Sequence, residues 1–423
     1  MFRKCFINCN QLLSGEFKLL IFDNYLGRYR KELLESVVPF WVHHSVDREH
    51  GGYFTCLDHD GEVYDTRKYV WMQGRAIWTF SKLYNEVDQR QEWLDAAACG
   101  IEFVRQHAFD AQGRSYFSLT RQGHPVFFQR KPYGAVFAVA GFLEYSKAVG
   151  DSKLRREGID LFWKIEEWIQ KPYLLDRPVL QGQIATSKLA DVMVMIMLLL
   201  ELMAVDDDPR YASLLSEYMR ASLKHREPRR NVFLEHVGTD GTILLDSPDG
   251  RLLNPGHSVE MAWFLLLALR RQPNRALQQE VLGILESSLE FGWDKEYGGI
   301  YYFMDIEGHP TLQLESNMKL WWPHTEALYA VILAYTLTRD SRWLAWLERL
   351  DTYAFQHFSD PAKGEWFGYC DRQGAVSNTC KGNHYKGFFH VPRFLIMSIQ
   401  EMEAFNLATV KGDRKAWSAD DFE

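Results

Sequence analysis

The 423-residue sequence has no apolar run long enough to cross a bilayer. A membrane-spanning helix needs about 18 apolar residues in succession, and the apolar segment 193–203 is shorter than that. Charges interrupt the apolar runs of the first 22 residues, which also lack a small-residue cleavage site, so we expect no signal peptide. A net charge of −8 argues against nucleic acid or an anionic membrane as the main partner.

Paired cysteines and the common short catalytic motifs are also missing. The six cysteines contain no C-x-x-C pair, which predicts reduced thiols in a cytoplasmic protein; they are Cys5, Cys9, Cys56, Cys99, Cys370 and Cys380. There is no H-E-x-x-H, G-x-x-x-x-G-K-[ST] or G-x-G-x-x-G motif. The histidines are dispersed along the chain, so the sequence predicts no metal site.

A short pattern of alternating aromatic residues around a glycine-containing turn recurs along the chain. It occupies 51–64, 113–126, 231–244, 298–311 and 364–377. Such alternation predicts β-hairpins. The turn glycines are separated by 62, 118, 67 and 66 residues, so one interval is double. Segment 173–182 fills the gap as a sixth unit that is turn-like and has lost its hairpin.

Helical segments separate these hairpins. Strongly apolar ones, predicted to be buried, lie at 73–87, 259–272, 325–338 and 390–405, and more polar ones precede hairpins at 94–109 and 343–358. Six units of two helices and a hairpin predict an all-α (α/α)6 toroid, or barrel, with short β-hairpins. We place this single catalytic domain at 19–410, after an N-terminal extension (1–18) and before a polar tail (411–423). The alternative is an open helical solenoid, which the lack of polar capping repeats disfavours.

The repeat also aligns unusual polar residues. Arg75 follows its turn glycine by 14 residues, His257 and His390 follow theirs by 16, and Glu326 by 18. All four therefore fall near the N-terminus of a buried helix, and in a ring of helices those ends converge. The spacing alone predicts one central pocket holding two histidines, an arginine and a glutamate.

His257 lies in LNPGHSVEMAWF, where Asn254 is suited to cap a helix and Pro255 to be its first residue. The helix dipole would disfavour a protonated imidazole there, leaving a base near neutral pH. A capping histidine is the alternative interpretation. Glu260 would orient His257, contact a ligand, or simply complement the dipole.

His390 and Arg393 lie one helical turn apart in KGFFHVPRFL. Either they form a structural pair, or the arginine binds an anionic or oxygen-rich partner. Further candidates for ligand binding come from two other motifs, KYVWMQGRAIW and MKLWWPHTEALYA; they are Tyr69, Gln73, Trp321 and His324. Any one of them could instead belong to the core.

VYDTRKYVWMQGRAIW, LNPGHSVEMAWFLL, MKLWWPHTEALYA and FHVPRF together resemble the N-acylglucosamine 2-epimerase family, which includes the renin-binding proteins. The resemblance covers about residues 30 to 400. It implies an (α/α)6 barrel, a homodimer and interconversion of N-acetylglucosamine and N-acetylmannosamine without a cofactor for the chemistry. It further implies His257 and His390 as the acid/base pair, Arg75, Glu326 and Arg393 as active-site residues, and ATP as an allosteric activator. Segment 187–200 departs from the Pro-containing stretch of related epimerases.

Inverting C2 of an opened sugar requires bases on both of its faces, which two opposed histidines provide. We expect Arg75 to stabilise the enediolate through the C1 oxygen. The alternatives are an aldose–ketose isomerase or a cellobiose/mannose 2-epimerase, a glycoside hydrolase and a non-catalytic binding protein. Hydrolysis would require two opposed carboxylates, whereas the aligned set holds two histidines and one clear acid.

Overall fold

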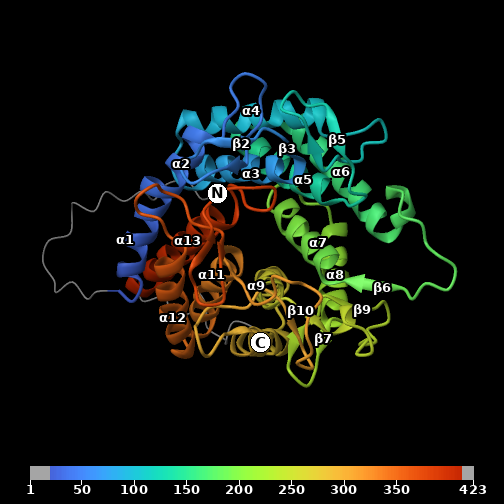
Figure 1. Ribbon diagram of the computed structural model, residues 1–423, viewed down its shortest axis with the longest axis vertical. Helices are drawn as coiled ribbons and strands as arrows, with labels where there is room; N and C mark the ends of the chain where they lie inside the picture. The colour runs from blue at the N-terminus through green and yellow to red at the C-terminus, as the bar shows by residue number, and fades with distance from the viewer. Residues whose placement is uncertain (1–19, 412–423) are drawn as a thin grey trace, which may run out of the picture.

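The computed structural model describes residues 20–411, in which helices are arranged as two concentric rings (Figure 1). The inner ring consists of α3 (Val70–Glu86), α5 (Tyr133–Val149), α7 (Leu189–Leu202), α9 (Pro255–Arg271), α11 (Trp321–Thr338) and α13 (His390–Val410). The outer ring consists of α1 (Asp23–Lys31), which continues through η1 (Glu32–Val37) into α2 (Val38–His44), and of α4 (Gln91–His107), α6 (Ser152–Gln170), α8 (Arg210–Leu223), α10 (Arg275–Gly292) and α12 (Arg342–His357).

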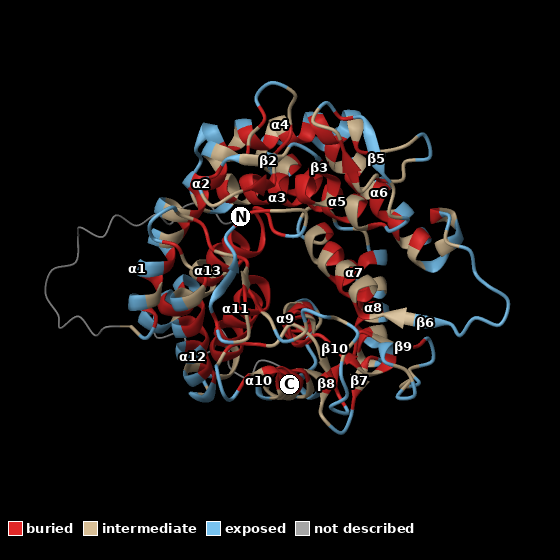
Figure 2. Cartoon of the chain, in the orientation of Figure 1, coloured by how far each residue is buried: buried red, intermediate tan, exposed pale blue. Residues whose placement is uncertain are grey.

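The inner ring is closed. Each inner helix contacts the next in chain order, and α13 returns to contact α3. The inner helices are buried on nearly all sides, as their sequences predict; residues 321–336 of α11, for example, are all buried (Figure 2). The predicted (α/α)6 barrel is therefore confirmed, and the open solenoid is wrong. None of the helices in residues 20–411 has both the length and the apolar character needed to cross a membrane.

Short strands connect the helices. They are β1 (Cys56–Leu57), β2 (Val63–Asp65), β3 (Lys68–Tyr69), β4 (Ser118–Leu119), β5 (Pro125–Phe127), β6 (Thr186–Lys188), β7 (Arg226–Glu227), β8 (Val232–Phe233), β9 (His236–Gly238), β10 (Leu252–Leu253), β11 (Met304–Asp305), β12 (Lys319–Leu320), β13 (Tyr369–Cys370) and β14 (Val376–Asn378). Two short 3-10 helices, η2 (Pro172–Leu175) and η3 (Asp249–Arg251), complete the described elements.

Three of the five predicted hairpins form as antiparallel pairs, namely β1–β2, β4–β5 and β13–β14. The predictions for 231–244 and 298–311 are wrong in their pairing, although the turns at Gly241 and Gly308 form. There β8 pairs with β7, β9 with β6, and β11 with β10, so strands that come earlier in the chain replace the returning strand. The weak sixth unit forms η2 and an extended loop without a hairpin, as expected.

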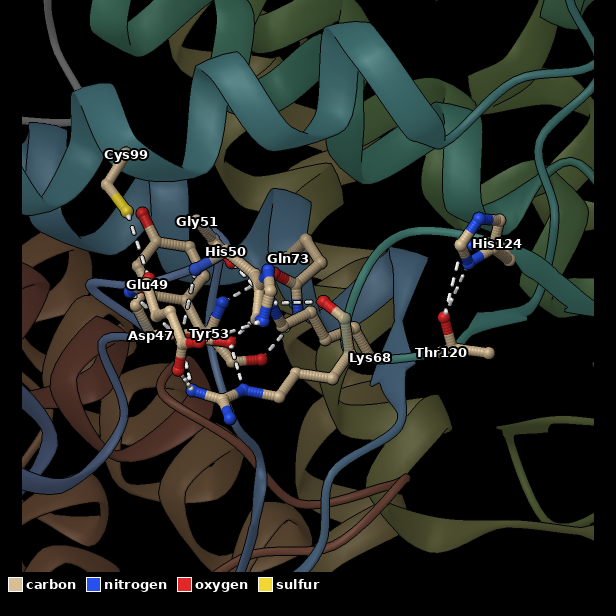
Figure 3. Close-up of polar contacts among 11 residues, drawn as sticks. Asp47, Glu49, His50, Gly51, Tyr53, Lys68, Gln73, Cys99, Thr120 and His124 are labelled. Atoms are coloured by element: carbon tan, nitrogen blue, oxygen red, sulfur yellow. Dashed lines mark hydrogen bonds and ion pairs between the residues drawn. The ribbon is translucent and has the colours of Figure 1, made fainter.

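One ion-pair arrangement recurs in three of the repeats. A buried aspartate binds a fully buried lysine from the strand segment that follows: Asp47 with Lys68 (Figure 3), Asp294 with Lys319 and Asp360 with Lys381. The same carboxylates also bind a side chain of the next repeat's turn, which is Arg121, Arg372 and His59 in that order. The last of these pairs joins the final repeat to the first and so contributes to closing the ring.

The predicted extension at 1–18, with Cys5 and Cys9, and residues 412–423 of the predicted tail lie outside the described residues. The other four cysteines are free thiols.

Candidate active site

A cavity of about 570 Å³ lies at the N-terminal ends of the inner helices. Every inner helix contributes side chains from its first turns, and the connecting loops complete the wall. Of the four residues that the repeat aligned, Arg75, His257 and His390 line this cavity, whereas Glu326 lies directly behind His390. The predicted convergence of helix ends is thus what builds the cavity.

His390, the first residue of α13, is paired with a carboxylate from the neighbouring helix. Its Nδ1 lies 2.7 Å from Glu326 Oε1. Because a carboxylate accepts, Nδ1 carries the proton and Nε2 keeps a lone pair. Burial, followed by the charges of Arg75 and Arg393, lowers the pKa of His390 well below its usual value. His390 is therefore a neutral base at neutral pH.

His257 has its own carboxylate partner. Asn254 caps α9 by accepting from the His257 backbone N–H, and Pro255 is the first helical residue, as predicted. The imidazole Nδ1 lies 2.9 Å from Glu235 Oε1, so Glu235, and not Glu260, orients this ring. Burial opposes protonation, but the Glu235 carboxylate outweighs it and the pKa of His257 is raised. The helix dipole was expected to lower the pKa of His257, and that direction is wrong, because a full charge in contact exceeds a partial one.

Both histidines lie against the same indole. The ring centroid of Trp322 is 4.9 Å from that of His257 and 5.8 Å from that of His390, with an interplanar angle of 39° in each case. The charge of His257 also contributes to the lowered pKa of His390, so the two rings interact. The cavity therefore holds an acidic and a basic imidazole close together.

Arg393 holds two glutamates behind the histidines. Its guanidinium binds Glu260 and lies 2.7 Å from Glu326 Oε2, which also accepts from Trp263 Nε1 at 3.1 Å. Donor atoms of Glu260, Glu326 and His390 lie within 4.8 Å of one another, a spacing that suits a metal ion. The guanidinium already supplies a positive charge to both carboxylates, so these residues fit an arginine-centred network better than a cation site.

Arg75 is buried, and no carboxylate of residues 20–411 forms an ion pair with it. Its guanidinium carbon lies 4.4 Å from the ring centroid of Trp71, 4.1 Å from Phe137 and 4.8 Å from Phe389. Among the described residues, its Nε has no hydrogen-bond partner. Burial and the charge of Arg393 lower the pKa of Arg75 to about 9, so it remains charged at neutral pH. A buried cation of this kind is ready to bind an anionic oxygen.

The other predicted ligand-binding residues divide between the cavity and the core. Trp321 lines the cavity, and its buried Nε1 has no partner among the described residues. Gln73 instead exchanges two hydrogen bonds with the backbone of Tyr53, next to the Asp47–Lys68 pair (Figure 3). His324 accepts from the Ile300 backbone N–H, and burial lowers its pKa to about 3.

Tyr69 contacts Asp65, Phe117 and His384. Gln73, His324 and Tyr69 are all absent from the cavity lining.

Residues 52–392 match the model of the family described as N-acylglucosamine 2-epimerase (GlcNAc 2-epimerase). The chain belongs to this family. The N-acylglucosamine 2-epimerase of Rattus norvegicus is 40% identical over 379 residues, covering 88% of this chain and 90% of the relative. The human N-acylglucosamine 2-epimerase is 38% identical over 372 residues, which are 86% and 87% of the two chains.

Solved structures of lower identity share the fold. A cellobiose 2-epimerase from Bacillus thermoamylovorans B4167 matches with a TM-score of 0.76 and 20% identity, over 89% of this chain and 99% of the other. A D-mannose isomerase matches with a TM-score of 0.76 and 19% identity, over 92% and 99%. At this identity the likeness concerns the fold alone.

The sequence reasoning missed Glu235 and Trp322 in this epimerase-family site. Both left a signal, since Glu235 interrupts the apolar run 232–237 and Trp322 adjoins the predicted Trp321. Assigning them requires the three-dimensional packing, because Glu235 reaches His257 from the loop between β8 and β9, and Trp322 reaches His390 from the neighbouring inner helix.

Proposed function

We propose that this chain interconverts N-acetylglucosamine and N-acetylmannosamine by inverting C2 of the opened sugar. One observation carries the proposal. Two histidines line a single cavity, each is oriented by its own carboxylate, and both contact the same indole ring. Membership of the N-acylglucosamine 2-epimerase family supports this choice of substrate. The catalyst is an isomerase, and the chemistry runs on its own side chains.

The two imidazoles have complementary proton states. With the sugar ring open, the C1 carbonyl acidifies the C2–H bond, and neutral His390 accepts that proton through Nε2. Protonated His257 then donates a proton to the opposite face of C2. In the reverse direction the roles exchange. The pair therefore works while one of the two rings is cationic and the other is neutral.

Arg75 stabilises the charge that develops during this transfer. The enediolate places negative charge on the C1 oxygen, and Arg75 is a buried cation of the cavity whose Nε has no hydrogen-bond partner among the described residues. Such stabilisation contributes a few kcal/mol, about 3 in comparable sites. Arg393 positions Glu260 and Glu326, and through Glu326 it fixes His390.

Incubation of the enzyme with N-acetylmannosamine in D2O tests the proposal. Because an imidazole N–H exchanges with solvent, the epimerised product should carry deuterium at C2, measured by proton NMR and mass spectrometry. His390→Asn and His257→Asn should each lower kcat by at least about 100-fold with the fold retained. Epimerised product without deuterium would refute the scheme.

Two alternative reactions give different results in that experiment. An aldose–ketose isomerase would leave N-acetylmannosamine unconverted, because a ketose needs an oxygen on C2, and would turn free mannose into a ketose with the label at C1. A glycoside hydrolase needs two opposed carboxylates, whereas Glu260 and Glu326 both bind one guanidinium. The carboxylates of this network therefore do not favour hydrolysis.

We also propose that the protein is a homodimer activated by ATP and acts in the cytoplasm. The family resemblance supports the first two properties, and the free thiols of the described cysteines support the third. Light scattering after size exclusion tests the dimer, and an ATP titration of the epimerisation rate tests activation.

A further inference from the structure

One wall of the active-site cavity differs chemically from the others. Helix α7 lies across the ring from α13 and His390 (Figure 1), and it contributes only apolar side chains to the lining. These are Ala190, Met193, Val194 and Met197, with Phe137 and Phe264 beside them. Each of the other inner helices presents at least one polar or charged side chain to the cavity.

A second, smaller chamber adjoins this wall. It has a volume of about 60 Å³ and shares Met197, Phe264, Phe389 and Arg393 with the active-site cavity. The residues that line only the chamber are Trp78, Ala140, Leu200, Glu201, Trp263, Leu267 and Met397.

The chamber offers apolar surface to a ligand. Of its charged members, Arg393 has its guanidinium bound by Glu260 and Glu326, and the Glu201 carboxylate accepts from Trp78 Nε1 at 3.1 Å. The volume corresponds to about two water-sized groups. Met197 lines both the chamber and the active-site cavity, and its unbranched thioether side chain changes rotamer readily.

On the basis of the proposed function, we infer that α7 seats the N-acyl chain of the substrate and that the chamber accepts chains up to about two carbons longer than acetyl. The acylamido nitrogen is bonded to C2, the carbon between the two histidines, so the acyl group must occupy the same cavity. Sugar hydroxyls placed against α7 would lose their hydrogen bonds, whereas an alkyl chain there loses none. The preferred substrate class therefore extends from N-acetyl to N-propanoyl and N-butanoyl hexosamines.

Comparing kcat/KM for N-acetyl-, N-propanoyl-, N-butanoyl- and N-hexanoylmannosamine tests this inference. The native enzyme should epimerise the first three within about tenfold of one another and should lose more than about tenfold at N-hexanoyl, because one unaccommodated methylene changes kcat/KM by roughly 10- to 200-fold. A loss of 100-fold at N-propanoyl would overturn the inference. Absence of turnover of N-acetylmannosamine would instead contradict the proposed function.

Substitutions that fill only the chamber test its role separately from that of the active-site cavity. Leu200 and Ala140 line the chamber without lining the active-site cavity. Leu200→Phe and Ala140→Val should leave kcat/KM for N-acetylmannosamine within about twofold and lower that for N-butanoylmannosamine by at least about tenfold. Leu214→Phe, on the outer helix α8, is the matched control and should change neither value.

Thermal unfolding of each variant confirms that it folds, and the two variants enter the chamber from different helices, so either one that folds carries the test. Equal losses for all acyl lengths, or no loss for N-butanoyl, would overturn the inference.

Discussion

At the scale of single residues, the two imidazoles of the cavity differ because their surroundings differ. His390 is buried beside two arginines, and its pKa is lowered well below the usual value. His257 contacts Glu235, which raises its pKa despite burial. At pH values between the two pKa values, His257 is cationic and His390 is neutral. The pH dependence of kcat/KM should therefore be bell-shaped, with its plateau in that range.

Replacing Glu235 should move one limb of that profile. In Glu235→Gln the negative charge is gone, so the pKa of His257 falls and the alkaline limb shifts to lower pH. The acid limb, which reports His390, should stay in place. Measuring kcat/KM for N-acetylmannosamine from pH 5 to 10 checks this.

Glu315→Gln is the matched control, because Glu315 also lines the cavity and, within residues 20–411, makes no hydrogen bond to either imidazole. An unchanged alkaline limb in Glu235→Gln would contradict the role given to this carboxylate.

At the scale of elements, local sequence predicts the helices well and their partners poorly. The buried helices formed where the apolar pattern placed them, and the Asn254–Pro255 start of α9 was readable because capping is local. The strand partners of 231–244 and 298–311 were not readable, because β9 pairs with β6 and β11 with β10 across long separations. The sequence also did not show that the buried polar groups of Gln73 and His324 accept hydrogen bonds from the backbone of a preceding turn, because those partners are likewise distant along the chain.

The α3–α5 contact sets the position of Arg75 and shows how packing reaches the site. A Cβ on Gly74 would lie 2.3 Å from the Phe137 carbonyl carbon and 2.4 Å from its oxygen. Gly74→Ala must therefore push α3 away from α5, costing about 1–3 kcal/mol of unfolding free energy. Because Arg75 and Phe137 both line the cavity, kcat/KM should fall as well.

Gly27→Ala in α1 is the matched control for that variant. Its Cβ would meet nothing within 4 Å, so the substitution should stabilise the protein by about 0.5–1 kcal/mol and leave activity unchanged. Chemical denaturation and steady-state kinetics measure both effects. A Gly74→Ala variant as stable as Gly27→Ala would contradict the packing argument.

At the scale of the whole molecule, the ion pair that closes the ring has the same arrangement as those of two internal repeats, except that a histidine takes the place of the arginine. Asp47 and Asp294 bind Arg121 and Arg372, but Asp360 binds His59 of the first repeat, 2.8 Å away. The repeat pattern predicted closure of the ring, yet no local signal in the sequence identifies His59 as the side chain at the junction. An arginine is always charged and can bind a carboxylate through two parallel N–H groups, whereas an imidazole offers a single ring nitrogen to it.

The junction should therefore gain stability from an arginine. Among these three sites, the pKa values of Asp47, Asp294 and Asp360 are lowered, so their carboxylates stabilise the fold above pH 4 and lose that effect only as pH falls through the lower folded values. At pH 7 all three carboxylates are charged, so the partner side chain decides how strong each pair is. His59→Arg should raise the unfolding free energy by up to about 1 kcal/mol, since His59 is partly exposed. The reciprocal control, Arg372→His, should lower the unfolding free energy. Denaturant unfolding of the three proteins at pH 7 measures the difference, and a His59→Arg variant no more stable than the native protein would show that this pair does not hold the ring together.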